Sequence, residues 1–216
     1  MNYTELKTAV EDFVENTFSA TDFANMTKLA EQRIYNSVQI PALRKNVTGT
    51  LTAGNKYLAA PLDFLSVFSM AVVAAGGDYS YLLNKDVNFI REAYPSASTQ
   101  GTPKYYALFG PDSSNLTELT FILGPTPSAG LTVELHYFYY PQSIVTANTS
   151  WLGDNFDSVL FNAVMVEAAR FMKQEQDIVA MMDKEYMQSL ALLKNLGDGK
   201  MRQDAYRSGQ VRTKVG

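Results

Sequence analysis

Apolar positions follow a helical spacing at the two ends of the chain and a strand-like spacing in the middle. Residues 1–40 and 153–205 have apolar residues three and four positions apart with charges between them, which is typical of amphipathic helices. Residues 46–140 read as short strands, and they hold only 11 of the 40 charged residues but 9 of the 13 tyrosines. This pattern predicts a core built from both chain ends, with a β-rich module inserted between them.

Two helices are predicted in the N-terminal part. The first covers about residues 4–18 and has an apolar face that includes Leu6 and Phe13, both expected in the core. Thr21 is a plausible N-cap for the second helix, which ends before Pro41 because proline cannot continue a helix. A break this short between two helices predicts an antiparallel helical hairpin.

The middle of the chain predicts an antiparallel β module. Gly54-Asn55 supplies a tight turn, which predicts a hairpin between the strands on either side of it. Residues 124–130 are expected to form the tip of a long hairpin that joins the last two strands. The other predicted elements are strands at 66–75, 79–83, 105–109, 118–123 and 131–140, and a short helix at 85–94.

Two further helices are predicted at about residues 155–173 and 175–196, with Leu160 in the core and Gly197 as the C-cap of the second. The whole pattern predicts an α+β protein with three parts. Residues 1–42 and 150–199 form a discontinuous four-helix bundle, residues 43–149 form the inserted antiparallel β-rich module, and residues 200–216 form an extended C-terminal arm.

Composition narrows the classes of function. The 216 residues are 46% hydrophobic, which is ample for a packed core, and the formal net charge of −4 argues against general nucleic-acid binding through a basic surface. The chain has no cysteine, which excludes disulfides and thiolate metal sites. No run approaches the roughly 18 apolar residues of a membrane-spanning helix, and the N-terminus lacks the pattern of a signal peptide. We expect a soluble protein with no membrane contact.

Residues that carry catalytic chemistry are sparse. His136 is the single histidine, and its place in the last strand favours an ordinary, hydrogen-bonded or solvated side chain. No phosphate-binding glycine-rich loop and no nucleophile elbow is present. Two pairs of carboxylates could bind a hard cation such as Mg²⁺ or Ca²⁺: Asp154 with Asp157, and Asp177 with Asp183. Acidic residues at the start of a helix are also favoured by the helix dipole, without any metal. We expect no catalytic residue, no cofactor and no metal, with a metal-dependent enzyme as an alternative.

Several short motifs occur in a fixed order along nearly the whole chain. They are Ala30-Glu31-Gln32-Arg33-Ile34, of the AE-x-RI kind; Leu58-Ala59-Ala60-Pro61-Leu62-Asp63-Phe64-Leu65, similar to LP-x-DFL but with Ala60 where leucine is usual; Gly101–Ala107; Tyr137–Pro141; and Asn148–Leu152, followed by Tyr186 and Leu190. Taken together, these motifs resemble the head-to-tail adaptor (connector) proteins of tailed bacteriophages.

That resemblance implies a structural protein of the virion, assembled in the host cytoplasm and placed at the head–tail junction. Such adaptors form a ring, commonly of twelve copies, that docks under the portal protein, joins it to tail, tail-tube or nozzle proteins, and leaves a channel through which DNA passes without specific binding. Another neck or tail component, such as a stopper or tail-tube protein, is the alternative.

The resemblance also implies that residues 200–216 form the portal-binding arm. The candidate contact residues in this segment are Lys200, Arg202, Tyr206, Arg207, Arg212 and Lys214.

Overall fold

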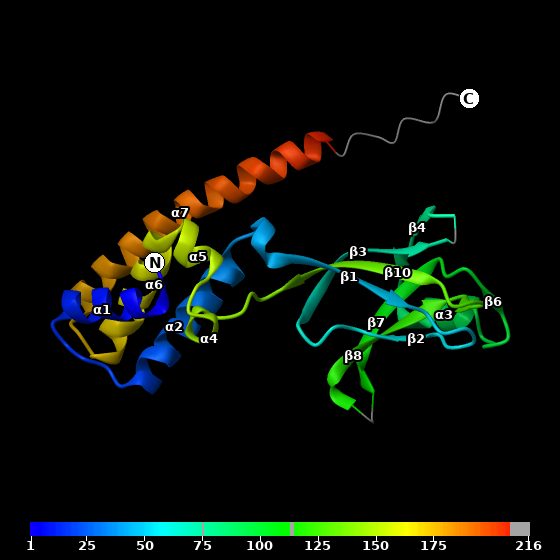
Figure 1. The fold of residues 1–216 in the computed structure, drawn as a ribbon, viewed down its shortest axis with the longest axis horizontal. Helices are drawn as coiled ribbons and strands as arrows, with labels where there is room; N and C mark the ends of the chain where they lie inside the picture. The colour runs from blue at the N-terminus through cyan, green and yellow to red at the C-terminus, as the bar shows by residue number, and fades with distance from the viewer. Residues whose placement is uncertain (75, 113–114, 208–216) are drawn as a thin grey trace. The chain divides into compact units, whose positions relative to one another are not determined.

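The computed structural model describes the backbone of residues 1–74, 76–112 and 115–207, and the side chains of residues 1–74, 76–111 and 118–196. It has the mixed α+β class predicted from the sequence, with mainly antiparallel sheets (Figure 1). The chain divides into two compact units, which we call the helical unit (Met1–Leu43 with Tyr140–Gly216) and the β unit (Arg44–Tyr139).

The helical unit is centred on one apolar helix. Helix α6 packs against α1, α2, α5 and α7, and it buries apolar side chains on most of its sides, as expected for a helix at the centre of a core. Leu160, predicted to lie in the core, is fully buried on this helix. The elements of the unit are α1 (Tyr3–Val14), α2 (Ala20–Ser37), η1 (Pro41–Leu43), α4 (Ile144–Ala147), α5 (Trp151–Asn155), α6 (Asp157–Phe171) and α7 (Gln176–Arg207).

Side-chain caps set where the first two helices start. Asn2 caps α1 in a capping box with Glu5, whose carboxylate accepts from the Asn2 amide. Helix α2 is capped by Ser19, whose hydroxyl accepts from the Asp22 amide, so the predicted cap at Thr21 is wrong by two residues. Because α4 and α5 also belong to this unit, its description as a four-helix bundle stays a prediction.

Phe13 was predicted to lie in the core, and this is wrong. Its side chain is 57% exposed, whereas Leu6 and Val10 on the same helix are fully buried. Helix α1 ends one residue later, at Val14, and Glu15 takes a left-handed conformation. Phe13 therefore lies at the margin of the apolar stripe, where its ring meets Phe161 edge to face with centroids 6.1 Å apart.

Helix α7 is longer than predicted. It does not end at Gly197 but continues to Arg207, so the backbone of residues 200–207 is helical rather than extended. A glycine inside a helix costs only about 1 kcal/mol relative to alanine. The residues around Gly197 and Gly199 include lysine, methionine, arginine and glutamine, which favour a helix and offset that cost.

The β unit is built of two main sheets with one shared core. Their strand orders are β1-β10-β3-β4 and β2-β8-β7-β5, and β6 pairs with β9 in a small parallel sheet. The elements are β1 (Arg44–Thr50), β2 (Tyr57–Ala59), β3 (Phe64–Val73), β4 (Tyr79–Tyr81), β5 (Leu83–Asn84), α3 (Val87–Ala93), β6 (Gln100–Gly101), β7 (Tyr105–Asp112), β8 (Asn115–Gly124), β9 (Thr126–Pro127) and β10 (Thr132–Tyr139).

Alternate residues of the strands fill this core. Val133, Leu135 and Tyr137, at alternate positions of β10, are buried, and they belong to one apolar cluster with Phe121 and Leu123 of β8. The two sheets therefore pack face to face, and helix α3 covers part of the opposite face of the second sheet through Ile90.

Two predicted hairpins are wrong in their pairing. Gly54 has the positive φ of 76° expected for a turn, but β1 pairs with β10 and β2 pairs with β8, so the turn carries the chain from one sheet to the other. Likewise, residues 124–130 connect β8 to β10 in different sheets and contain β9, which pairs with β6. Strands β3 and β4 do pair directly as an antiparallel hairpin, with Ala71 opposite Tyr81.

Candidate interaction surfaces

The predicted arm residues are placed only in part. Lys200, Arg202, Tyr206 and Arg207 lie on the last turns of α7, where the backbone is described and the side chains are not. The remaining two, Arg212 and Lys214, lie outside the described residues. The role of this segment as a portal-binding arm stays a prediction.

The carboxylate pairs that left a metal site open do not form a cluster. No group of three or more His, Asp or Glu side chains that could hold a metal ion occurs in the part of the chain that the structure describes. Asp154 and Asp157 lie in the first turns of α5 and α6, and Asp183 approaches Arg170 at 4.0 Å. His136 makes ordinary contacts, with Ser69 Oγ at 3.1 Å and Glu134 at 3.2 Å.

Glu31, in the AE-x-RI motif, joins two distant parts of the helical unit. Its carboxylate is only 3% exposed and accepts a hydrogen bond of 2.9 Å from the Ile144 amide at the start of α4. Burial raises the pKa of Glu31, although the bonds from Ile144 and Ser143 and the nearby Lys28 oppose that shift. The motif thus fixes the segment that returns from the β unit onto helix α2.

Arg33 of the same motif links three helices. Its guanidinium donates to the Glu167 carboxylate on α6, and it lies over the ring of Tyr186 on α7, 5.8 Å from the centroid. Arg170 extends this network, because it lies 3.7 Å from the same carboxylate. Burial lowers the pKa of Arg33, and so does the charge of Arg170. These polar side chains hold together helices that lie far apart in the sequence.

Asp63, in the motif that resembles LP-x-DFL, secures the turn between β2 and β3. It accepts hydrogen bonds of 2.8 Å from the Tyr137 hydroxyl and 2.7 Å from Lys45 Nζ. Burial alone would raise the pKa of Asp63, but these two bonds outweigh it and lower the pKa. The hydrogen bond to Asp63 raises the pKa of Lys45. The side chain of the neighbouring Leu62 is 79% exposed.

Strand β3 turns two apolar side chains to the solvent through two irregularities in its pairing with β10. The register skips Leu65 between Phe64 and Ser66, and it skips Phe68 between Val67 and Ser69. Leu65 is 45% exposed and Phe68 is 54% exposed. Such β-bulges re-aim side chains and are frequent next to functional sites.

The exposed ring of Phe68 is held in place by its neighbours. It meets Phe138 edge to face with centroids 6.0 Å apart, and the Arg44 guanidinium lies 4.8 Å from its centroid. We call Arg44, Leu65, Phe68 and Phe138 the bulge patch. A hollow of about 440 Å³ lies beside it, lined in part by Lys45 and His136.

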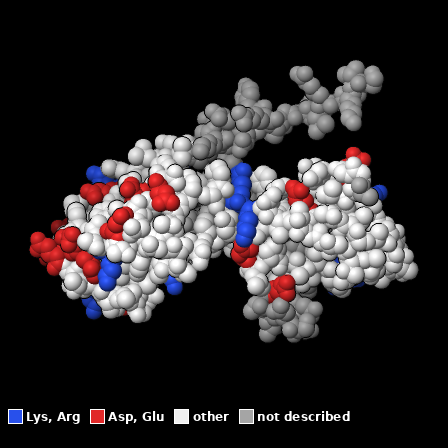
Figure 2. Space-filling model, in the orientation of Figure 1, with Lys and Arg blue, Asp and Glu red and all other residues white. Residues whose placement is uncertain are grey.

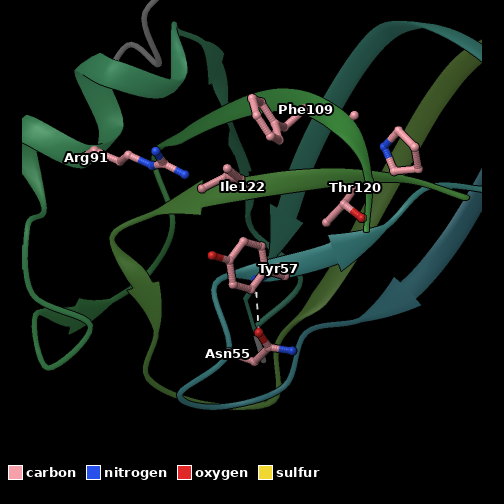
Figure 3. Close-up of a pocket in the computed structure, with 8 residues that line it drawn as sticks. Asn55, Tyr57, Arg91, Phe109, Thr120 and Ile122 are labelled. Atoms are coloured by element: carbon pink, nitrogen blue, oxygen red, sulfur yellow. Dashed lines mark hydrogen bonds between the residues drawn. The ribbon is translucent and has the colours of Figure 1, made fainter. Parts of the chain in front are cut away.

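A second surface of the β unit is a groove on the outer face of the sheet β2-β8-β7-β5. Figure 3 shows the side chains of Tyr57, Phe109, Thr120 and Arg91 around this groove, which has a volume of about 500 Å³. Tyr57 and Phe109 are each at least half exposed, and Arg91 of α3 supplies the cation among the lining side chains. The groove offers aromatic surface and one positive charge to a partner.

The helical unit has a groove of its own, of about 220 Å³, where α1, α6 and α7 meet. We call it the helical groove. Its lining residues are Phe13, Val14, Glu15, Met165, Ala169, Met172, Gln174 and Met182. Periodicity did not predict this groove, because an apolar face such as the one with Phe13 indicates a core.

Acidic side chains border the helical groove. Figure 2 shows them gathered over α1, whose last turn contains no basic residue. Glu11 is engaged, with Lys7 at 3.7 Å and with the Phe18 amide as a donor at 2.8 Å. Asp12 and Glu15 are exposed and take part in none of the ion pairs formed among the described side chains.

Residues 1–214 match the profile of the SU10 adaptor protein family. The chain belongs to this family of phage adaptor proteins. No curated protein matches it.

Membership confirms the resemblance to phage adaptors that the motifs indicated. An adaptor is a structural component of the virion, and it acts by contact with other head or tail proteins. Among the described residues of this adaptor, no helix is both long enough and apolar enough to cross a membrane.

Proposed function

We propose that this adaptor forms a ring, with twelve copies, that docks under the portal protein and joins the head to the tail while leaving a channel for DNA. The observation that carries the proposal is the family match, which covers residues 1–214 and therefore both units. No catalytic step, metal or cofactor is part of it.

The proposal gives each unit a different partner. Helices α1, α2, α6 and α7 act as a discontinuous four-helix bundle, a wedge that repeats around the ring axis. The links through Glu31, which is buried, and Arg33, which is partly buried, support this role because they tie the chain ends into one piece. The β unit, joined to it by only two chain crossings, presents the groove around Tyr57 and Arg91 to tail, tail-tube or nozzle proteins.

The C-terminal segment is proposed to grip the portal. Residues 197–216 carry five Lys and Arg against two Asp, whereas residues 1–43 and 140–196 together carry 13 Asp and Glu against 7 Lys and Arg. A basic segment on an acidic protein suits an acidic site on a partner. The acidic balance of the rest of the chain also suits a DNA channel, since a basic wall would bind the passing duplex through counterion release.

The experiment that tests the proposal is assembly on the purified portal protein of the same phage. Twelve copies of the 24.0 kDa chain would add about 290 kDa to the portal ring, a change that mass photometry or light scattering resolves. Binding to tail components without any binding to the portal would contradict the proposal and indicate a stopper or tail-tube protein.

Truncation separates the arm from the rest of the adaptor. We expect a chain that ends at Gly199 to keep its melting temperature and to lose portal binding, because the arm candidates all follow that residue. A matched control keeps the full length and replaces only Arg207, Arg212 and Lys214 with glutamine. Portal binding by the truncated chain at the affinity of the full chain would show that the segment is not the arm.

A further inference from the structure

The bulge patch has the composition of an anchor in a protein interface. Arginine and aromatic residues dominate the energetic centres of such interfaces. Here the Arg44 guanidinium lies 4.8 Å from the centroid of Phe68 and 5.8 Å from that of Phe138, so the rings and the cation form one assembly. Two interruptions of the β3–β10 ladder fall at Leu65 and Phe68, the two exposed apolar residues that β3 contributes to the patch.

The helical groove offers the complementary features. Its walls are methionine and phenylalanine side chains, and methionine adapts to a partner because its side chain is unbranched and flexible. Its volume of about 220 Å³ suits one large side chain rather than a long peptide.

The acids beside the groove are placed where they weaken their own helix. Asp12 lies in the last turn of α1 and Glu15 is its C-cap, next to backbone carbonyls that already carry partial negative charge. Neither acid joins an ion pair with another described side chain. A cationic partner would offset this unfavourable position.

We propose that the bulge patch of one copy docks on the helical groove of the neighbouring copy, with Phe68 in the groove and Arg44 against Asp12 and Glu15. The partner is thus a second copy of this chain, and the inference rests on the proposed ring. Such a contact joins two different surfaces of identical chains, which is the type of interface that closes a ring.

Cross-linking between two single-cysteine variants tests the contact directly. The chain has no cysteine, so Asn16→Cys and Asn46→Cys each introduce the sole thiol at an exposed position that flanks the contact without forming it. Asn16 follows Glu15 of the helical groove, and Asn46 lines the hollow beside the bulge patch. The two variants are mixed and treated with a short bismaleimide, both alone at high concentration and on the portal. We expect a covalent dimer from the mixture that exceeds the yield from either variant alone at least tenfold.

Tyr81→Cys replaces Asn46→Cys in the control mixture, because Tyr81 is 66% exposed on another strand of the same sheet. A dimer from the Asn16→Cys and Asn46→Cys mixture, with none from the control mixture, supports the contact. A portal-bound ring without this dimer overturns the inference and leaves the ring intact. A dimer without any portal binding supports the contact and contradicts the portal docking.

Exchanging the charges of the two sides tests whether Arg44 pairs with Asp12 and Glu15 of the neighbouring copy. Asp12→Lys with Glu15→Lys should raise the melting temperature, since cations favour the C-terminal end of a helix, and yet weaken association between copies about tenfold or more. Adding Arg44→Glu to the same chain should restore association. If the lysine variant associates as strongly as the natural chain, the acids do not take part and the proposed orientation is wrong.

Discussion

The helical unit joins segments far apart in the sequence through buried and partly buried polar side chains, whereas the β unit joins its two sheets through aromatic and aliphatic packing. Glu31 and Arg33 reach residues more than a hundred positions away, at Ile144 and Glu167. In the β unit, Phe121 is fully buried against Phe64, and the polar contacts of Asp63 lie near the surface.

This difference predicts which kinds of substitution destabilise each unit. A buried carboxylate that loses its partner, or that is ionised without enough compensation, destabilises strongly, whereas an exposed ion pair contributes little. Polar substitutions should therefore harm the helical unit more than the β unit, while truncation of a core side chain should harm both.

The largest effects are expected from core truncations that compare the two units. Phe121→Ala should destabilise the β unit by about 3–5 kcal/mol, and Leu160→Ala should destabilise the helical unit by about 2–5 kcal/mol, because each leaves a cavity in a fully buried site. Urea-induced unfolding, together with calorimetry as a second experiment, measures the free energy of unfolding of both variants. A loss below about 1 kcal/mol for either variant would place that side chain outside the core.

The next largest loss of stability is expected when the carboxylate of Glu31 is removed. Removing its carboxylate in Glu31→Ala leaves the buried Ile144 amide without an acceptor, which should cost about 1–3 kcal/mol. Glu31→Gln is the matched control, because its amide oxygen still accepts that bond. An equal loss for both variants would mean that the charge, and not the hydrogen bond, matters.

The pH dependence of Glu31 has a definite sign. Burial raises its pKa in the folded state, so the folded protein holds this proton more tightly than the unfolded chain does. The stability contributed by the protonated form is present below the unfolded pKa of about 4.5 and is lost as the pH rises through the folded pKa. The free energy of unfolding of Glu31→Gln relative to the natural chain should therefore increase from pH 4.5 upward; a constant difference would contradict the raised pKa.

Asp63 should show a smaller effect of the opposite sign. Its folded pKa is lowered, so its stabilising contribution is present above the unfolded pKa of 3.8 and is lost as the pH falls through the folded pKa. Because its side chain is 37% exposed, Asp63→Asn should cost less than about 1 kcal/mol at neutral pH, and salt should reduce the cost further. A larger loss that is insensitive to salt would indicate that the Tyr137 bond, and not Lys45, dominates.

The smallest effect on stability is expected at Phe13. Phe13→Ala should change the free energy of unfolding by no more than about 0.5 kcal/mol, because the ring is 57% exposed. Thermal unfolding of the isolated protein tests this, with Leu160→Ala as the contrast. A loss of several kcal/mol would show that Phe13 is a core residue. Its side chain could then not line the groove proposed to receive the neighbouring copy.

Local patterns predicted most of the helices and strands, and they failed where distant parts of the chain decide the outcome. The stripe with Leu6 and Val10, the alternation through Tyr137 and the turn at Gly54 are all present. The partners of the strands on either side of Gly54 were predicted wrongly, because a turn fixes a change of direction but not which sheet each strand joins. No pattern in the sequence predicted the two bulges of β3.

The amino-acid sequence by itself determined the α+β class, the positions of most elements and the resemblance to adaptors, since these depend on side-chain spacing and short motifs along the chain. Only the tertiary structure decided that Phe13 and Phe68 are exposed and that Glu31 holds the chain returning from the β unit. The physical reason is that exposure and partnership depend on contacts between residues distant in the sequence, and periodicity carries no information about which distant residues meet.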